Sequence, residues 1–200
     1  MTNMPNAFAT GRSPKDAAVV ATQPLLNMLT DDELEGVLAH EISHVRNRDI
    51  LVMSVASTMA SIIAYVTRIA VWSAMFSGGD NRNQNILVAV LADITLPVAA
   101  ALIQLGVSRS REYLADESGA RLTGKPMALA SALTKIENGC SSPHNKYDNP
   151  SYENVWISNP SGKKRSSKLA SLFSTHPSTQ DRIERLKALD EELNGIRHVY

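Results

Sequence analysis

Residues 30–47 read TDDELEGVLAHEISHVRN, and this stretch decides the fold. Thr30, followed three residues later by Glu33, is a capping box, which marks the start of a helix. Apolar residues then recur at helical spacing, at Leu34, Val37, Leu38, Ile42 and Val45. The sequence therefore predicts an amphipathic helix from about Asp31 through Asn47.

The second half of this helix carries His40-Glu41-Ile42-Ser43-His44, which matches the pattern H-E-x-x-H. His40 and His44 are one turn apart, so both imidazoles project from the same face and can bind one zinc ion. Glu41 lies next to them and can act as a general base on water at the metal. Two surface histidines are the alternative, but the capped amphipathic helix is the context in which the motif binds zinc.

Two apolar segments follow this helix. No charged residue occurs between Ile50 and Thr67, and Asp93 is the one charged residue between Ile86 and Val107. Both segments are long enough to cross a membrane, although core helices of a soluble all-α domain are the alternative. A hairpin that turns near Asn81 would place Arg68 and Asp93 at matching depths. An ion pair between them would offset the cost of either charge in lipid.

Basic residues flank the outer ends of the two segments, at Arg46, Arg48, Arg109 and Arg111. The connecting loop carries only Asp80 and Arg82 as charged residues. By the positive-inside rule, both flanks face the cytoplasm. The chain is thus expected in the cytoplasmic (inner) membrane as a multi-pass protein, with its active site on the cytoplasmic side.

A catalytic zinc site needs a third protein ligand and an open position for water. His44 lies six residues before the first apolar segment, and Glu112 lies five residues after the second. At 1.5 Å per helical residue, both extend roughly 8 to 9 Å beyond the hairpin. Glu112 is therefore the candidate third ligand, with Asp116 and Glu117 as rivals and a plain surface carboxylate as the alternative. Asp116 could also accept a hydrogen bond from a ligand imidazole.

Composition excludes several classes of protein. The 200 residues include 20 basic and 20 acidic side chains, so the net charge of zero removes the electrostatic argument for a nucleic-acid binder. The single cysteine, Cys140, excludes a disulfide scaffold and a cysteine-ligated metal site.

The ends of the chain predict smaller elements. Asn6–Thr10 and Ala17–Ala21 are expected to pair as strands around a turn at Gly11–Pro14. Residues 138–168 follow a helix near 126–137 and are rich in Ser, Asn, Pro, Lys and Gly, which predicts a long mobile loop. An amphipathic C-terminal helix is predicted from the spacing of Ile183, Leu186, Leu189, Leu193 and Ile196.

Several blocks together resemble the HtpX family of membrane-integrated zinc metalloproteases, which are relatives of the CAAX prenyl proteases. In family order, the blocks are Pro5–Gly11, Gly36–His44, Asn47–Asp49, Ser108–Asp116, Thr175–Pro177 and Asp181–Ile183. The resemblance implies a mainly α fold with a small β-sheet. Its gluzincin-type zinc peptidase core would carry the hydrophobic hairpin between the H-E-x-x-H helix and the third-ligand helix. Residues 1–49 and 108–200 would form the peptidase domain, and residues 50–107 the transmembrane hairpin.

The resemblance also implies roles for individual residues. One Zn²⁺ would be held by His40, His44 and Glu112, with Glu41 as the general base and Asp116 as support. His176 and Arg182 would lie near the substrate carbonyl, although His176 beside Pro177 could simply begin a helix. An edge strand would pair with extended substrate, and it corresponds to Asn6, Ala7, Phe8, Ala9 and Thr10.

The implied function is an endopeptidase that cleaves misfolded or damaged membrane proteins. Its partners would be protein or peptide substrates and the lipid bilayer, without nucleic acid. A catalytically idle membrane scaffold with structural zinc is the alternative, and a prenyl-protein protease is disfavoured because one hairpin could not enclose the larger membrane chamber of those relatives. Family members usually carry two further hydrophobic helices before the Pro5 block, so the chain looks truncated at this end, either as a piece of a longer protein or as a naturally short form.

Overall fold

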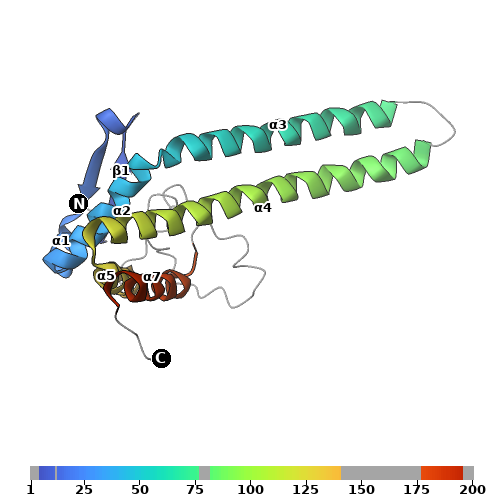
Figure 1. Ribbon diagram of the computed structural model, residues 1–200. Helices are drawn as coiled ribbons and strands as arrows, with labels where there is room; N and C mark the ends of the chain where they lie inside the picture. Colours follow the sequence, from blue (N-terminus) through green and yellow to red (C-terminus); the bar gives the residue numbers. More distant parts are fainter. Residues whose placement is uncertain (1–4, 12, 77–81, 141–176, 196–200) are drawn as a thin grey trace. The chain divides into compact units, whose positions relative to one another are not determined.

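The computed structural model of the chain describes residues 5–11, 13–76, 82–140 and 177–195. The chain divides into two compact units. Unit 1 contains residues 1–50 and 109–200, and unit 2 contains residues 51–108. Helices α3 (Asp49–Phe76) and α4 (Arg82–Thr123) therefore each begin in one unit and end in the other (Figure 1).

A two-stranded antiparallel sheet opens the chain. Strand β1 (Ala7–Thr10) pairs with β2 (Ala18–Ala21), with Phe8 opposite Val20. The short helices η1 (Pro14–Asp16) and α1 (Gln23–Met28) lie within and after this hairpin. Both predicted strands are thus confirmed to within one residue.

Helix α2 (Asp31–Arg46) begins as the capping box predicts. The Glu33 amide donates to Thr30 Oγ1, and the Thr30 amide donates to a Glu33 carboxylate oxygen at 2.8 Å. The same carboxylate is nearly buried and accepts hydrogen bonds from Ser131 Oγ and Lys135 Nζ, each at 2.7 Å. One side chain therefore caps α2 and joins it to the neighbouring helix α5 (Pro126–Cys140).

Glu33 should make the stability of the chain depend on acid pH. Burial alone would raise the pKa of Glu33, but the hydrogen bonds from Lys135, Ser131 and Thr30 lower it to about 2. Because the pKa is depressed in the folded state, the stabilisation is complete above the ordinary value of 4.5 and is lost as the pH falls from there towards 2. We expect a loss of about 2 kcal/mol over this window, since Lys135 is partly exposed to solvent.

Chemical denaturation at pH 6 and pH 3 measures this loss, and Glu33→Gln should reduce the difference between the two pH values. Asp32→Asn is the matched control, because Asp32 is an exposed neighbour that pairs with Lys125 at the surface. An equal pH dependence in wild type and Glu33→Gln would contradict the assignment.

The hydrophobic core lies in unit 1 among α2, α5 and α7 (Thr179–Asn194). Its buried members come from six elements and the segment after α1: Ala7, Leu25, Leu29, Val37, Ala120, Leu129, Ala130, Ala132, Leu133, Ile136, Leu186 and Leu189. The predicted C-terminal helix is confirmed over Thr179–Asn194, and Ile196 lies outside the described residues. Helix α5 continues to Cys140, so the loop prediction is wrong for residues 138–140, while 141–168 lie outside the described part.

A close approach of two backbones sets the distance between α2 and α4. A Cβ atom at Gly119 would lie 2.9 Å from the backbone nitrogen of His40, closer than real Cβ contacts allow. Gly119 is buried and helical, so the small size of glycine, and not its conformational freedom, is what this position requires.

Gly119→Ala should therefore lower the free energy of unfolding by about 1–3 kcal/mol, because a backbone atom must move to admit the methyl group. Gly106→Ala on the same helix is the control, since nothing lies within 4 Å of its Cβ position. This change should be neutral or stabilising by up to about 1 kcal/mol. Equal unfolding midpoints for the two variants would show that α2 and α4 do not meet at Gly119.

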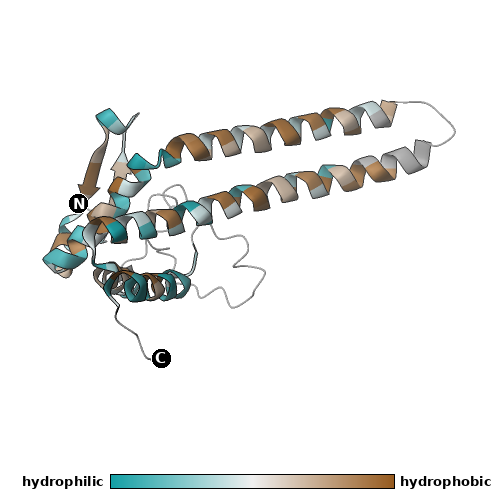
Figure 2. Ribbon diagram, viewed as in Figure 1, coloured by the Kyte–Doolittle hydropathy of each residue, from teal (hydrophilic) through white to brown (hydrophobic). Residues whose placement is uncertain are grey.

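Unit 2 consists of the hydrophobic parts of α3 and α4. The spans Asp49–Ser73 and Val90–Thr123 each contain an 18-residue stretch that is long and apolar enough to cross a membrane, and 6% of each such stretch is buried within the chain. Figure 2 shows hydrophobic residues along most of both helices in this unit. A hydrogen bond of 2.8 Å from Gln104 Nε2 to Ser57 Oγ joins the two helices.

The proposed ion pair inside the hairpin does not form. Arg68 and Asp93 are both exposed, and no ion pair joins them in the described part of the chain. Depth along a hairpin follows from counting residues, but the direction of a side chain around the helix does not. The pair was predicted from depth alone, and the prediction is wrong.

Candidate metal centre

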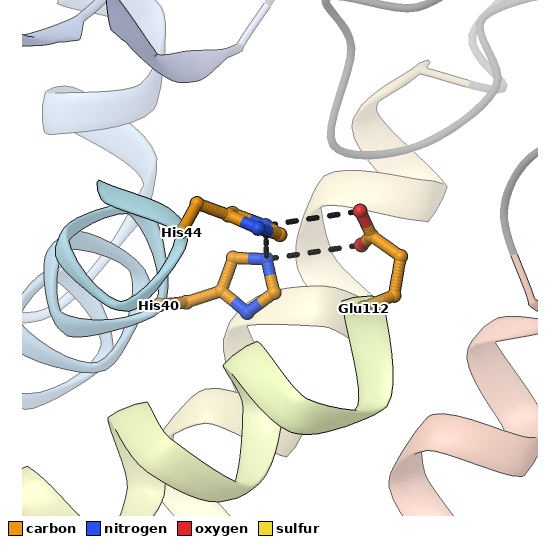
Figure 3. A group of neighbouring side chains, drawn as sticks. All are labelled: His40, His44 and Glu112. Atoms are coloured by element: carbon orange, nitrogen blue, oxygen red, sulfur yellow. Dashed lines mark hydrogen bonds and ion pairs between the residues drawn. The ribbon is translucent and has the colours of Figure 1, made fainter. Parts of the chain in front are cut away.

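Three side chains on two helices of unit 1 converge on one point (Figure 3). His40 and His44 project from α2, and Glu112 projects from α4. Their donor atoms lie within 4.8 Å of one another, a group that could hold a metal ion. The two Nε2 atoms are 3.1 Å apart, and the carboxylate oxygens of Glu112 are 3.7 Å from His44 Nε2 and 3.8 Å from His40 Nε2.

Each imidazole is backed by a carboxylate at its other nitrogen. His44 Nδ1 is 2.6 Å from Asp49 Oδ2. His40 Nδ1 is 3.0 Å from Asp116 Oδ1, which is ion-pair distance, although the contact departs from the angle of a straight hydrogen bond. These partners favour the tautomer with the proton on Nδ1, which leaves a lone pair on each Nε2.

The donor set fits a metal ion. Two Nε2 lone pairs that face each other at 3.1 Å repel unless a proton or a cation lies between them. Tetrahedral zinc with bonds of about 2.0–2.1 Å places its ligand atoms roughly 3.3 Å apart. The three distances of 3.1, 3.7 and 3.8 Å come near this value without any change of helix position. Two histidines and one glutamate are also a donor set of catalytic zinc sites, which keep a fourth position open.

Glu41 lies beside this group without being part of it. The side chain is buried, and its Oε2 accepts a hydrogen bond of 3.1 Å from the backbone amide of Ala9. Burial raises the pKa of Glu41, while the imidazoles of His40 and His44 oppose the shift. A basic carboxylate is therefore held one residue from His40, a candidate metal ligand.

The hydrogen bond from the Ala9 amide to Glu41 leaves the edge of β1 that does not pair with β2. Asn6 uses its backbone carbonyl to accept from the Thr22 amide at 2.9 Å, so Asn6, Phe8 and Thr10 direct their main-chain groups towards β2. Ala7 and Ala9 direct theirs to the opposite edge. That edge is the one that reaches Glu41.

A buried ion pair completes the surroundings of His40. Arg182 on α7 is 3% exposed and donates to both carboxylate oxygens of Asp116, from Nε at 2.7 Å and from Nη2 at 2.6 Å. Its Nη1 is 3.6 Å from Glu112 Oε2. Burial would raise the pKa of Asp116, but the charge of Arg182 and the contact with His40 lower it below the ordinary value.

The structure thus brings together His40, His44, Glu112, Glu41, Asp116 and Arg182, with β1 next to Glu41. His176 lies outside the described residues. Sequence reasoning assigned no role at this site to Asp49 or Arg111, although Asp49 contacts His44 and Arg111 contacts Asp49. The signals for them were an acidic residue five positions after His44 and a basic residue directly before Glu112.

Comparison with known proteins places the chain among peptidases. Residues 1–190 match the model of the family described as Peptidase family M48. "Protease HtpX homolog" proteins from three organisms are about half identical to this chain in sequence. The values are 49% over 197 residues for Thermococcus sibiricus, 51% over 193 for Thermococcus kodakarensis and 50% over 197 for Pyrococcus furiosus. These alignments cover 96, 94 and 98% of this chain and 66, 65 and 67% of the relatives, so the chain spans about two thirds of their length.

A solved structure shares the fold. The crystal structure of S. mikatae Ste24p superposes with a TM-score of 0.58 at 22% identity, over 92% of this chain and 42% of that chain. This likeness and the elements of the chain confirm the predicted fold class, a mainly α fold with a small β-sheet and an inserted pair of hydrophobic helices.

Proposed function

Because the chain belongs to peptidase family M48, among the HtpX homologues, we propose that it is a zinc-dependent endopeptidase of a membrane. The observation that carries the proposal is the convergence of two histidine lone pairs and the Glu112 carboxylate beside Glu41. Glu41 is buried at the site although it is not one of the three donors, so a purely structural metal site does not account for it.

In this proposal His40, His44 and Glu112 hold one Zn²⁺. When bound, zinc supplies Lewis-acid polarisation of the scissile carbonyl and makes water a stronger acid. Glu41 accepts a proton from the attacking water and returns it to the leaving amine as the peptide bond breaks. The Ala9 amide holds the Glu41 carboxylate in place for both transfers.

Two further contributions are proposed from the surroundings of the site. The edge of β1 that does not pair with β2 would receive extended substrate through main-chain groups other than the Ala9 amide, which is bonded to Glu41. Such main-chain pairing tolerates many sequences. Arg182 and His176 would share the negative charge that develops on the carbonyl oxygen. Arg182 approaches the donor set with two groups. Its Nη2, which is also bonded to Asp116, lies 3.5 Å from His40 Nε2, and its Nη1 lies 3.6 Å from Glu112 Oε2.

Residues 1–49 and 108–200 are proposed as the peptidase domain, and residues 50–107 as a transmembrane hairpin. Large apolar side chains of the hairpin are exposed, including Ile62, Tyr65 and Leu87. Exposure of this extent along two long helices is costly in water and favourable in lipid. With both basic flanks on the cytoplasmic side, the active site would face the cytoplasm, and misfolded or damaged membrane proteins would be the substrates.

A cleavage assay in detergent or liposomes tests the proposal. The zinc-loaded chain should cleave an unfolded casein, lose this activity with a zinc chelator and regain it with one equivalent of zinc. A chain that binds one zinc ion and cleaves neither casein nor an unfolded membrane protein would instead support the scaffold with structural zinc.

A further inference from the structure

We propose that Asp49 and Arg111 form a positioning pair that fixes the orientation of the metal ligand His44. This inference deepens the proposed function and rests on it. Asp49 is 7% exposed and uses its two oxygens differently. Oδ2 lies 2.6 Å from His44 Nδ1, while Oδ1 accepts from Arg111 Nε at 2.7 Å and also from Arg111 Nη2.

Arg111 donates hydrogen bonds to Asn47 as well as to Asp49. Its Nη2 also donates to the backbone carbonyl of Asn47 at 2.9 Å, at the end of α2. The guanidinium therefore fixes both the carboxylate of Asp49 and the turn that precedes it. Because the planar fork of arginine has a set geometry, the carboxylate cannot rotate away from His44 without breaking these bonds.

The contact between Asp49 and His44 requires a break in the helix. In a continuous helix, a residue five positions on is rotated by about 140° from its starting point, so Asp49 would face away from His44. The chain turns instead at Arg48, whose φ of 54° is left-handed. Such a conformation is strained for a residue other than glycine, and here it brings the carboxylate back onto the imidazole.

The two ligand histidines are thus supported in the same way. His40 is backed by Asp116, which Arg182 clamps with two hydrogen bonds. His44 is backed by Asp49, which Arg111 clamps. The side chain of His44 is 21% exposed against 4% for His40, so packing restrains it less and its orientation depends more on the carboxylate.

The pair also bears on the third ligand. Arg111 directly precedes Glu112 on α4, and Asp49 is the first residue of α3. The chain leaves unit 1 after Ile50 and returns at Arg109, so the ion pair joins the two ends of the inserted segment. The bond between Arg111 and Asp49 therefore also holds the helical turn that carries Glu112, and this bond is lost in either single variant.

Metal affinity and the visible spectrum of bound Co²⁺ test the proposal in the full chain. Asp49→Asn should raise the dissociation constant for Co²⁺ by about 10–100-fold and shift the absorption bands, because the imidazole loses its anionic partner. Arg111→Ala should raise the constant by about 10-fold, and Arg111→Lys by less.

A double variant separates positioning from general support. Because Arg111 acts through Asp49, Asp49→Asn with Arg111→Ala should bind Co²⁺ no more weakly than Asp49→Asn alone. Arg121→Ala is the matched control, since Arg121 on the same helix pairs with Glu117 and Glu192 at the surface. It should leave affinity and spectrum unchanged.

The results of these measurements distinguish a failure of the positioning pair from a failure of the proposed function. If wild type binds Co²⁺ but the Asp49 and Arg111 variants keep its affinity and spectrum, the positioning pair is refuted while the metal site stands. Additive losses in the double variant would also refute it. If wild type binds no Co²⁺, the proposed function itself fails. Should Asp49→Asn not fold by circular dichroism, Arg111→Lys decides, because it keeps the charge and loses only the fork.

Discussion

Replacing Glu41 with Gln is expected to slow peptide hydrolysis by about 10²–10⁴-fold while the chain still binds its metal. Glutamine cannot take a proton from water at the pH of the assay, but it keeps the size of glutamate. Its amide oxygen can still accept the hydrogen bond from the Ala9 amide. Because Glu41 is not one of the three converging donors, metal binding should persist.

The measurement compares cleavage rates at equal metal content, with bound zinc quantified for each preparation. Glu35→Gln is the control on the same helix, since Glu35 is exposed and pairs with Lys125 away from the metal donors. It should keep the wild-type rate. A Glu41→Gln variant that cleaves as fast as wild type at full metal content would remove Glu41 from the mechanism.

The parts of this site that could be predicted from sequence are those set by local geometry. His40 and His44 are four residues apart on one capped helix, so their convergence follows from the helical repeat. Counting residues outward from the two apolar segments made Glu112 the candidate third ligand. The same count left Asp116 and Glu117 as rivals. Only the resemblance to a family separated them. In the structure, Glu112 is the residue whose carboxylate lies in one donor group with the imidazoles of His40 and His44.

The parts that could not be predicted are contacts between residues far apart in sequence. Arg111 and Asp49 are 62 residues apart, and Arg182 and Asp116 are 66 apart. Whether such side chains meet depends on the rotation of each helix about its own axis, which no spacing determines. The same uncertainty explains the mistaken pair of Arg68 and Asp93, whose depth in the hairpin was estimated without knowledge of their direction.

Arg182 has two expected contributions, one to the hydrolysis of substrate and one to the stability of the fold. The family resemblance implies a role near the substrate carbonyl, whereas the geometry gives it a second task. Its guanidinium is 3% exposed and makes two hydrogen bonds to Asp116, which joins α7 to α4. Loss of Arg182 should therefore affect folding as well as any rate.

Arg182→Met is expected to lower the free energy of unfolding by about 3–5 kcal/mol. The substitution removes one member of a buried ion pair and leaves the carboxylate of Asp116 without its cation in a buried place. Replacing both partners, with Asp116→Leu and Arg182→Met, should recover most of this loss, because an apolar pair of similar volume has no charge to desolvate. The double variant should still bind metal weakly, since His40 loses its carboxylate.

Chemical denaturation followed by circular dichroism measures these differences, and Arg185→Met provides the comparison on the same helix. Arg185 is exposed and lies 3.9 Å over the ring of Tyr113, a contact worth about 0.5–1 kcal/mol. If Arg182→Met costs no more than Arg185→Met, the buried pair does not hold α7 against α4. If the double variant recovers stability but not metal affinity, Asp116 supports His40 separately from its part in folding. The ion pair then has two distinct roles, one in metal binding and one in the stability of the fold.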